Sequence, residues 1–134
     1  MSTVVQELLQ DHAHLTSSLL KVQRIGIQTE EGRNLLVQVK KALLAHLAKE
    51  DTDLYPVLWK AAETDEKLKG TLEQYAKDMG QISASAIAFF EKYCSLQGDK
   101  EDFEKDCRGL IRALCKRIGN EEAVLYKKFD EIVR

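Results

Sequence analysis

Apolar residues recur along this chain at steps of three and four positions, the spacing of one face of an α-helix. Four such stripes can be counted, and a few polar residues stand among them. The stripes are Val5, Leu8, His12, Leu15, Leu19 and Val22; Leu36, Val39, Leu43, His46, Glu50, Leu54 and Val57; Leu72, Tyr75, Met79, Ile82, Ala86, Phe89 and Tyr93; and Cys107, Leu110, Leu114, Arg117, Glu121 and Leu125. The pattern predicts an all-α chain whose helices share one core.

Connectors rich in glycine or charged residues separate the stripes. They lie at 26–32, 63–67 and 96–102, and they leave helices of about 3–25, 30–62, 66–95 and 100–132. Short links favour antiparallel neighbours, so we predict an up-down-up-down four-helix bundle. The 134 residues are the size of one domain, which we expect to span 1–134.

Two segments near the ends of the second and fourth predicted helices resemble each other. HLAKEDTDLYPVL (46–58) and RIGNEEAVLYKKF (117–129) share an apolar residue at their second position, a Glu-acid pair and a Leu-Tyr pair. A weaker similarity relates DHAHLTSSLL (11–20) to DMGQISASAI (78–87). The chain therefore reads as two helical hairpins, 1–64 and 65–134, related by a pseudo-twofold axis.

Five polar residues occupy positions on the inward stripes: His12, His46, Glu50, Arg117 and Glu121. Burying carboxylates without a partner is costly, so a positive charge is expected between the two glutamates. His46 and Glu50 are four residues apart and project from one helix face, where imidazole and carboxylate form a suitable ligand pair for iron, zinc or manganese.

Two interpretations of this cluster are open. In the first, a divalent ion is bound by His12, His46, Glu50 and Glu121. In the second, Arg117 and one protonated histidine neutralise the carboxylates without any metal.

The other distinctive side chains have structural interpretations. His14 falls off its stripe and is expected at the surface. Asp51 and Glu122 follow the stripe glutamates and are expected on a solvated face. The alternative is that they support the site by contacting the residues on the stripes. The residues expected to fill the core or an interface are Tyr55, Tyr126, Trp59 and Met79.

Charge and apolar content exclude several classes of partner. Twenty basic residues oppose 22 acidic ones, so we predict neither a nucleic-acid nor a membrane partner. No signal peptide or spanning segment is evident, which favours a cytoplasmic protein. The three cysteines, Cys94, Cys107 and Cys115, form no Cys-x-x-Cys pair and are expected to be reduced packing residues.

Three motifs together resemble the hemerythrin-like family, also called the HHE cation-binding domain. They are QDHAHL in the first predicted helix, HLAKEDTDLYP in the second and RIGNEEAVLY in the fourth. The resemblance implies a four-helix bundle that holds a pair of non-haem irons, bridged by carboxylates and capped by histidines. Members of this family carry or sense oxygen, or handle iron, nitric oxide and oxidative stress.

The resemblance assigns roles to single residues. His12 and His46 match terminal histidine ligands, and Glu50 and Glu121 match the bridging carboxylates. Met79 and Arg117 stand where the family has its other histidines. Because a guanidinium does not ligate metals and repels a second cation, we expect at most one ion per chain.

Two functions follow as hypotheses. One is a metal-binding protein with a single ion, for which iron is favoured and zinc or manganese are alternatives. Such a protein would sense a small diatomic ligand, handle metal or respond to stress. The other is a metal-free module that binds a protein partner and keeps a structural His/Arg/Glu cluster. The sequence shows no nucleophile-base pair and no phosphate-binding loop, so we predict no catalytic residues.

Overall fold

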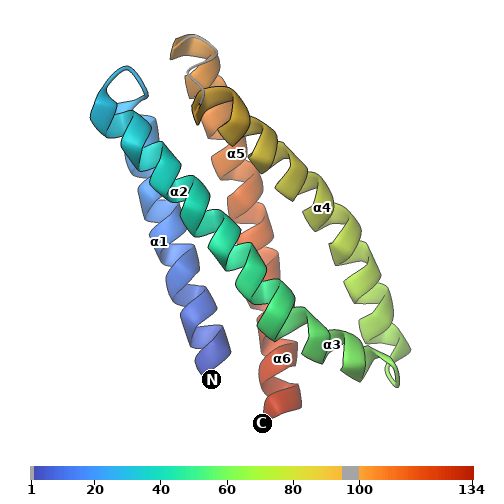
Figure 1. The fold of residues 1–134 in the computed structure, drawn as a ribbon. Coiled ribbons are helices and arrows are strands. Elements are labelled where there is room, and N and C mark those ends of the chain that lie inside the picture. The colour runs from blue at the N-terminus through green and yellow to red at the C-terminus, as the bar shows by residue number, and fades with distance from the viewer. Residues whose placement is uncertain (1, 95–99) are drawn as a thin grey trace.

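The computed structural model describes residues 2–94 and 100–134, and this part of the chain forms an all-α four-helix bundle (Figure 1). Two of the four long helices are continuous, and the other two each contain one π-helical turn. The elements are α1 (Thr3–Ile25), α2 (Glu30–Lys49), the π turn η1 (Glu50–Leu54), α3 (Tyr55–Ala62), α4 (Glu66–Cys94), α5 (Lys100–Asn120), the π turn η2 (Glu121–Leu125) and α6 (Tyr126–Val133). The predicted fold class is confirmed.

The four helices begin where the sequence predicted. α1, α2, α4 and α5 start at residues 3, 30, 66 and 100. Residue 95 of the third predicted helix and residues 96–99 of the last predicted connector lie outside the described residues. None of the helices in the described ranges has a stretch long and apolar enough to cross a bilayer.

Capping interactions explain the connection between α1 and α2. Gly26 ends α1 with a positive φ of 77°, and its N–H donates to Val22 O at 2.7 Å. Thr29 caps α2, since its hydroxyl accepts from the N–H of Gly32 at 3.1 Å. A Cβ at position 32 would lie 1.8 Å from the carbonyl oxygen of Gly26, so the link also needs a glycine there.

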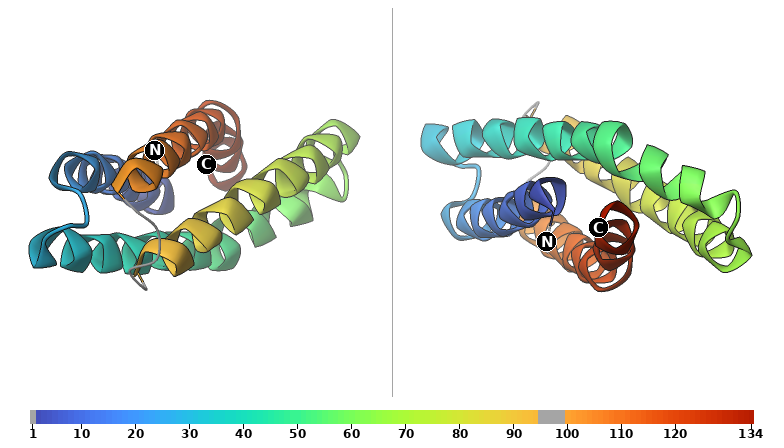
Figure 2. Two further views of the ribbon diagram at one scale, coloured as in Figure 1. Left: turned by 90° about the horizontal axis from the view of Figure 1, so that it is seen from above. Right: turned by 90° about the horizontal axis from the view of Figure 1, so that it is seen from below.

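The bundle has two layers, with α1 beside α5 and α6 in one, and α2, α3 and α4 in the other (Figure 2). Its apolar core is divided into two clusters by a layer of polar side chains. The first cluster includes Leu15, Leu19, Leu36, Leu43, Phe89, Phe90, Tyr93, Phe103, Cys107 and Leu114. The second includes Val5, Leu8, Leu54, Leu58, Leu68, Leu72, Met79, Leu125, Tyr126 and Phe129. The buried polar residues therefore lie midway along the bundle.

The two π turns lie at this polar layer and were not predicted. Each begins at a stripe glutamate: the N–H of Tyr55 bonds to Glu50 O, and the N–H of Tyr126 bonds to Glu121 O. A hydrogen bond to the fifth preceding residue defines the π-helix, which often marks functional sites. Leu54 and Leu125 are both fully buried, and buried positions continue at steps of four to Leu58 and Phe129, although Val57 of the predicted stripe is only half-buried.

The cysteine prediction is correct in part. Cys107 is buried in the first core cluster, as expected of a packing residue. Cys94 is half-buried and packs against the same cluster, whereas Cys115 is exposed, so packing does not describe its position.

Two neighbouring residues of the second π turn differ in burial, so their truncation should change the free energy of unfolding by different amounts. Leu125 is fully buried and its neighbour Val124 is 41% exposed. Leu125→Ala should lower the free energy of unfolding by about 3 kcal/mol, because it leaves a cavity in the second core cluster. Val124→Ala, the matched control, should cost less than about 1 kcal/mol. Urea denaturation followed by circular dichroism measures both, and equal losses would contradict the assigned packing.

Candidate metal centre

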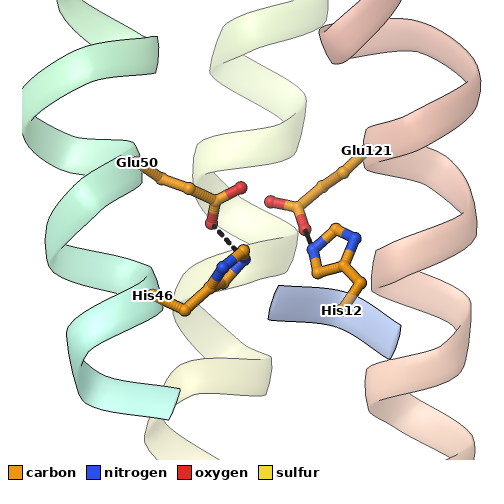
Figure 3. Close-up of side chains that lie close together, drawn as sticks. All are labelled: His12, His46, Glu50 and Glu121. Carbon is orange, nitrogen blue, oxygen red and sulfur yellow. Dashed lines mark ion pairs between the residues drawn. The ribbon is translucent and has the colours of Figure 1, made fainter. Parts of the chain in front are cut away.

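Four side chains from three of the long helices converge on the bundle axis (Figure 3). His12 comes from α1, His46 from α2, Glu50 from the start of η1 and Glu121 from the start of η2. Each offers one nitrogen or oxygen atom, and these four atoms all lie within 4.8 Å of one another. All four residues are buried. The structure thus brings together the four residues that the sequence singled out.

The contacts pair each histidine with one glutamate. His12 Nε2 lies 3.3 Å from Glu121 Oε1, and His46 Nε2 lies 3.5 Å from Glu50 Oε1. The two imidazole rings are adjacent, with centroids 4.6 Å apart. Both Nε2 atoms therefore lie beside the carboxylates, where a cation could contact all four groups.

A carboxylate holds the outer nitrogen of each histidine. His12 Nδ1 donates to Glu122 Oε2 at 2.9 Å, and His46 Nδ1 donates to Asp11 Oδ2 at 3.0 Å. Lys49 Nζ also donates to Asp11 Oδ2, at 3.1 Å. Such carboxylate partners fix ring orientation and commonly accompany metal-binding histidines, because they leave Nε2 as the ligating atom.

These outer partners revise the sequence interpretation. Glu122 follows the alternative interpretation, support of the site, rather than the solvated face that was expected first, since it is half-buried and bonded to His12. Asp51 and His14 are exposed, as expected. The role of Asp11 was not predicted, because its position directly before His12 gives no sign that it bonds to His46 on α2.

Arg117 occupies the other side of the carboxylates. Its Nη2 lies 3.5 Å from Glu50 Oε1, and its Nε lies 3.6 Å from Glu121 Oε2. Its Nη1 donates to Ser83 Oγ at 2.8 Å and to the carbonyl oxygen of Met79 at 3.4 Å. The guanidinium is therefore anchored to α4 and supplies positive charge to both glutamates.

Two tyrosines contribute hydroxyl groups to this layer. The Tyr126 hydroxyl donates to Glu50 Oε2 at 2.9 Å and lies 3.0 Å from His12 Nε2. The Tyr55 hydroxyl instead donates to Met79 Sδ at 2.7 Å. Tyr126 and Met79 are buried as expected, but the polar contacts of Tyr126 were not foreseen. Trp59, expected in a core or an interface, is 38% exposed.

When both glutamates are ionised, three buried atoms at the centre make no hydrogen bond within the described residues, whereas a protonated Glu50 bonds to Glu121. The three atoms are His46 Nε2, Glu50 Oε1 and Glu121 Oε2. Their nearest charged neighbours, at 3.5 to 3.6 Å, are beyond ordinary hydrogen-bond length. Glu121 Oε2 lies beside Arg117, whereas His46 Nε2 and Glu50 Oε1 lie beside each other, and a metal ion between the histidines and the glutamates would give these two atoms a common partner.

The protonation of the two glutamates differs. Burial and the neighbouring Glu121 raise the pKa of Glu50 to about 9. Burial also acts to raise the pKa of Glu121, but its hydrogen bond with His12 and the charge of Arg117 outweigh burial and lower it. Without metal, Glu50 is therefore neutral at pH 7 while Glu121 is ionised.

The two histidines differ in the same way. Burial disfavours the charged form of His12, but hydrogen bonds with Glu121 and Glu122 raise its pKa overall. Burial lowers the pKa of His46 despite its hydrogen bond to Asp11. His46 is thus the more readily available of the two imidazoles for a metal, because its neutral form is favoured whereas the charged form of His12 is favoured.

A small cavity adjoins the four residues. It has a volume of about 20 Å³, enough for one water-sized molecule, and its lining includes His12, His46, Glu121, Leu15, Leu43 and Ile111. Its exposed lining is mostly apolar, so a small molecule there would face the imidazoles on one side and hydrocarbon on the other.

A comparison with protein families agrees with this geometry. The model of the hemerythrin HHE cation-binding domain matches residues 3–129. The chain belongs to this family. Its membership in the hemerythrin family implies metal binding, and the four convergent residues of this HHE domain could hold the ion. No curated protein and no solved structure matched the chain.

The difference in protonation between Glu50 and Glu121 predicts how the stability of the metal-free protein depends on pH. Because folding raises the pKa of Glu50 from an ordinary value of 4.5 to about 9, its contribution to stability is greatest below pH 4.5 and is lost as pH rises towards 9. Glu50→Gln removes this titration and should leave the free energy of unfolding unchanged at pH 5 and raise it at pH 8.

Glu121→Gln is the matched comparison. It removes a charge that pairs with Arg117 and His12, so it should lower the free energy of unfolding at pH 7 by about 3 kcal/mol. Chemical denaturation with chelator present measures both variants. If Glu50→Gln lowers the free energy of unfolding at pH 8 more than Glu121→Gln does, the assigned charges are wrong.

Proposed function

We propose that this HHE domain binds one metal ion through His12, His46, Glu50 and Glu121, and that this ion is iron rather than zinc or manganese. The observation that carries the proposal is that one ligand atom from each of these four buried residues lies within 4.8 Å of the others, and that His46 Nε2 has no hydrogen-bond partner. Two nitrogens and two carboxylates suit iron, and zinc and manganese accept the same donors. The carboxylates of Glu122 and Asp11 orient the two imidazoles towards the ion.

We propose one ion per chain because Arg117 occupies the place of a second. Its guanidinium lies 3.5 and 3.6 Å from oxygens of the two glutamates, and Ser83 and Met79 hold it there. A divalent ion, Arg117 and two ionised glutamates give a net charge of +1. A second divalent ion would raise this to +3 in a buried site, which desolvation and repulsion oppose.

The proposed role is sensing of a small ligand, metal handling or a response to oxidative stress. A bound iron ion would supply a Lewis-acidic and redox-active centre. Around it, the apolar cavity of about 20 Å³ limits access to molecules of water or diatomic size. The four proposed ligands are themselves buried, so the residues favour a small neutral ligand over a larger substrate.

One observation favours a second candidate, a metal-free interaction module. The metal-free cluster can be close to neutral, since Glu50 is protonated at pH 7 and Arg117 faces the ionised Glu121. In that case the polar layer serves the fold alone, and a protein partner would bind elsewhere on the surface. The metal content of the protein separates the two candidates.

Metal loading is the direct test. After incubation with ferrous iron without oxygen and removal of excess metal, the wild-type protein should retain about one iron per chain. His46→Ala and Glu50→Ala should each lose most of it, because each removes one ligand. His14→Ala, which changes an exposed histidine outside the site, is the matched control and should retain the full amount. Elemental analysis gives the ratio, and no retained metal in the wild-type protein would favour the interaction module.

The proposed metal count has its own test. Met79→His combined with Arg117→His removes the guanidinium and adds two imidazoles beside the same carboxylates. This double variant should bind about two ions per chain, whereas Met79→His alone should bind about one because Arg117 remains. A wild-type ratio of two, measured by elemental analysis after the same loading, would contradict the role given to Arg117.

A further inference from the structure

The hydroxyl of Tyr126 is placed among the proposed ligand atoms rather than behind them. It lies 3.0 Å from His12 Nε2 and 2.9 Å from Glu50 Oε2, and these two groups come from different helices. The side chain is only 2% exposed. Its ring also stacks on the imidazole of His12, with centroids 5.4 Å apart and planes inclined by 15°. The oxygen is thus fixed in place on the histidine side of the centre.

The Tyr126 hydroxyl is at hydrogen-bond distance from both groups in the metal-free structure, and the same spacing allows the three atoms to be ligands on one ion. Bonds of about 2.1 Å place two ligand atoms about 3.0 Å apart when they meet at a right angle on the ion. The Tyr126 oxygen has this separation from both His12 Nε2 and Glu50 Oε2. Tyr126 meets His12 at Nε2, the ring nitrogen that faces the carboxylates, whereas Glu122 meets the outer Nδ1 of the same ring.

From this geometry we propose that the phenol oxygen of Tyr126 is a fifth ligand when the site holds trivalent iron. The inference rests on the proposed function, because it requires that the four-residue site binds iron. Phenolate oxygen is an established iron ligand in proteins. On binding, the O–H bond of Tyr126 breaks, an iron–oxygen bond forms and the proton leaves to water, and no electron is transferred.

Charge supports this assignment. Trivalent iron with the carboxylates of Glu50 and Glu121 and the cation of Arg117 would give the buried site a net charge of +2. A phenolate from Tyr126 reduces that charge to +1, the value for divalent iron with a neutral phenol. Because extra buried charge is costly, the tyrosine offers a way to hold trivalent iron beside the fixed guanidinium.

Tyr55 provides a matched comparison within the same chain. It follows the first π turn as Tyr126 follows the second, and both are preceded by a buried leucine. Its hydroxyl donates to Met79 Sδ at 2.7 Å, on the side of the layer occupied by Arg117. The two tyrosines thus have equivalent positions along their helices but different neighbours, and the inference assigns ligation to Tyr126 alone.

The experiment loads wild-type protein, Tyr126→Phe and Tyr55→Phe with ferric citrate, removes excess metal, and records iron content and visible absorption. Wild type and Tyr55→Phe should show the broad phenolate-to-iron charge-transfer band, with about one iron per chain. Tyr126→Phe should lose the band and bind iron at least about tenfold more weakly, as expected for a lost ligand.

Two results would overturn the inference while leaving the proposed function intact: wild-type protein with one ferric ion but no such band, or a band that persists in Tyr126→Phe. Failure of wild-type protein to retain either ferrous or ferric iron would instead overturn the proposed function. Should Tyr126→Phe not fold, resonance Raman spectra of the wild-type protein decide the matter. Tyrosine ring vibrations must be enhanced in the band and must survive in Phe variants of Tyr55, Tyr75 and Tyr93.

Discussion

The burial of two carboxylates at one level of the bundle is the constraint on which the rest of the site depends. Glu50 and Glu121 are almost completely inaccessible to water. Imidazoles on one side and a guanidinium on the other compensate them, and a tyrosine hydroxyl bonds to one of them. Apolar clusters on both sides of this layer hold the four long helices in the register that keeps these groups together.

The centre is chemically asymmetric, although the two helical segments that carry its glutamates have the same backbone conformation. Both glutamates begin a π turn, and a leucine and a tyrosine follow at the same distances. His46 precedes one glutamate by four residues, and Arg117 precedes the other. A neutral imidazole can bind a cation, whereas a guanidinium takes the place of one. Imidazole or guanidinium at this position thus changes the charge that the layer holds without changing the fold that builds it.

The sequence predicted the helices and the identity of the central residues because both depend on local spacing. Gly26 and Thr29 mark a helix end and a helix start, and the stripe positions place His12 and Glu121 inwards. Interactions between helices were harder to predict. Nothing in the spacing shows that Asp11 reaches His46, or that Tyr126 contacts Glu50 and His12, because these pairs depend on how neighbouring helices are rotated. The π turns escaped detection because the apolar pattern continues through them.

The π turns also bear on how such a site could arise or be lost. A π turn closes its hydrogen bond one residue later than an α turn, so each turn holds one residue more than a regular helix needs. Removing that residue from either turn would return the helix to the α form while the flanking apolar stripes kept their faces. The glutamate and tyrosine of that turn would then no longer share one level. Deletion of a single residue disrupts most helices, but at either of these two turns it would keep the bundle and dismantle only its centre.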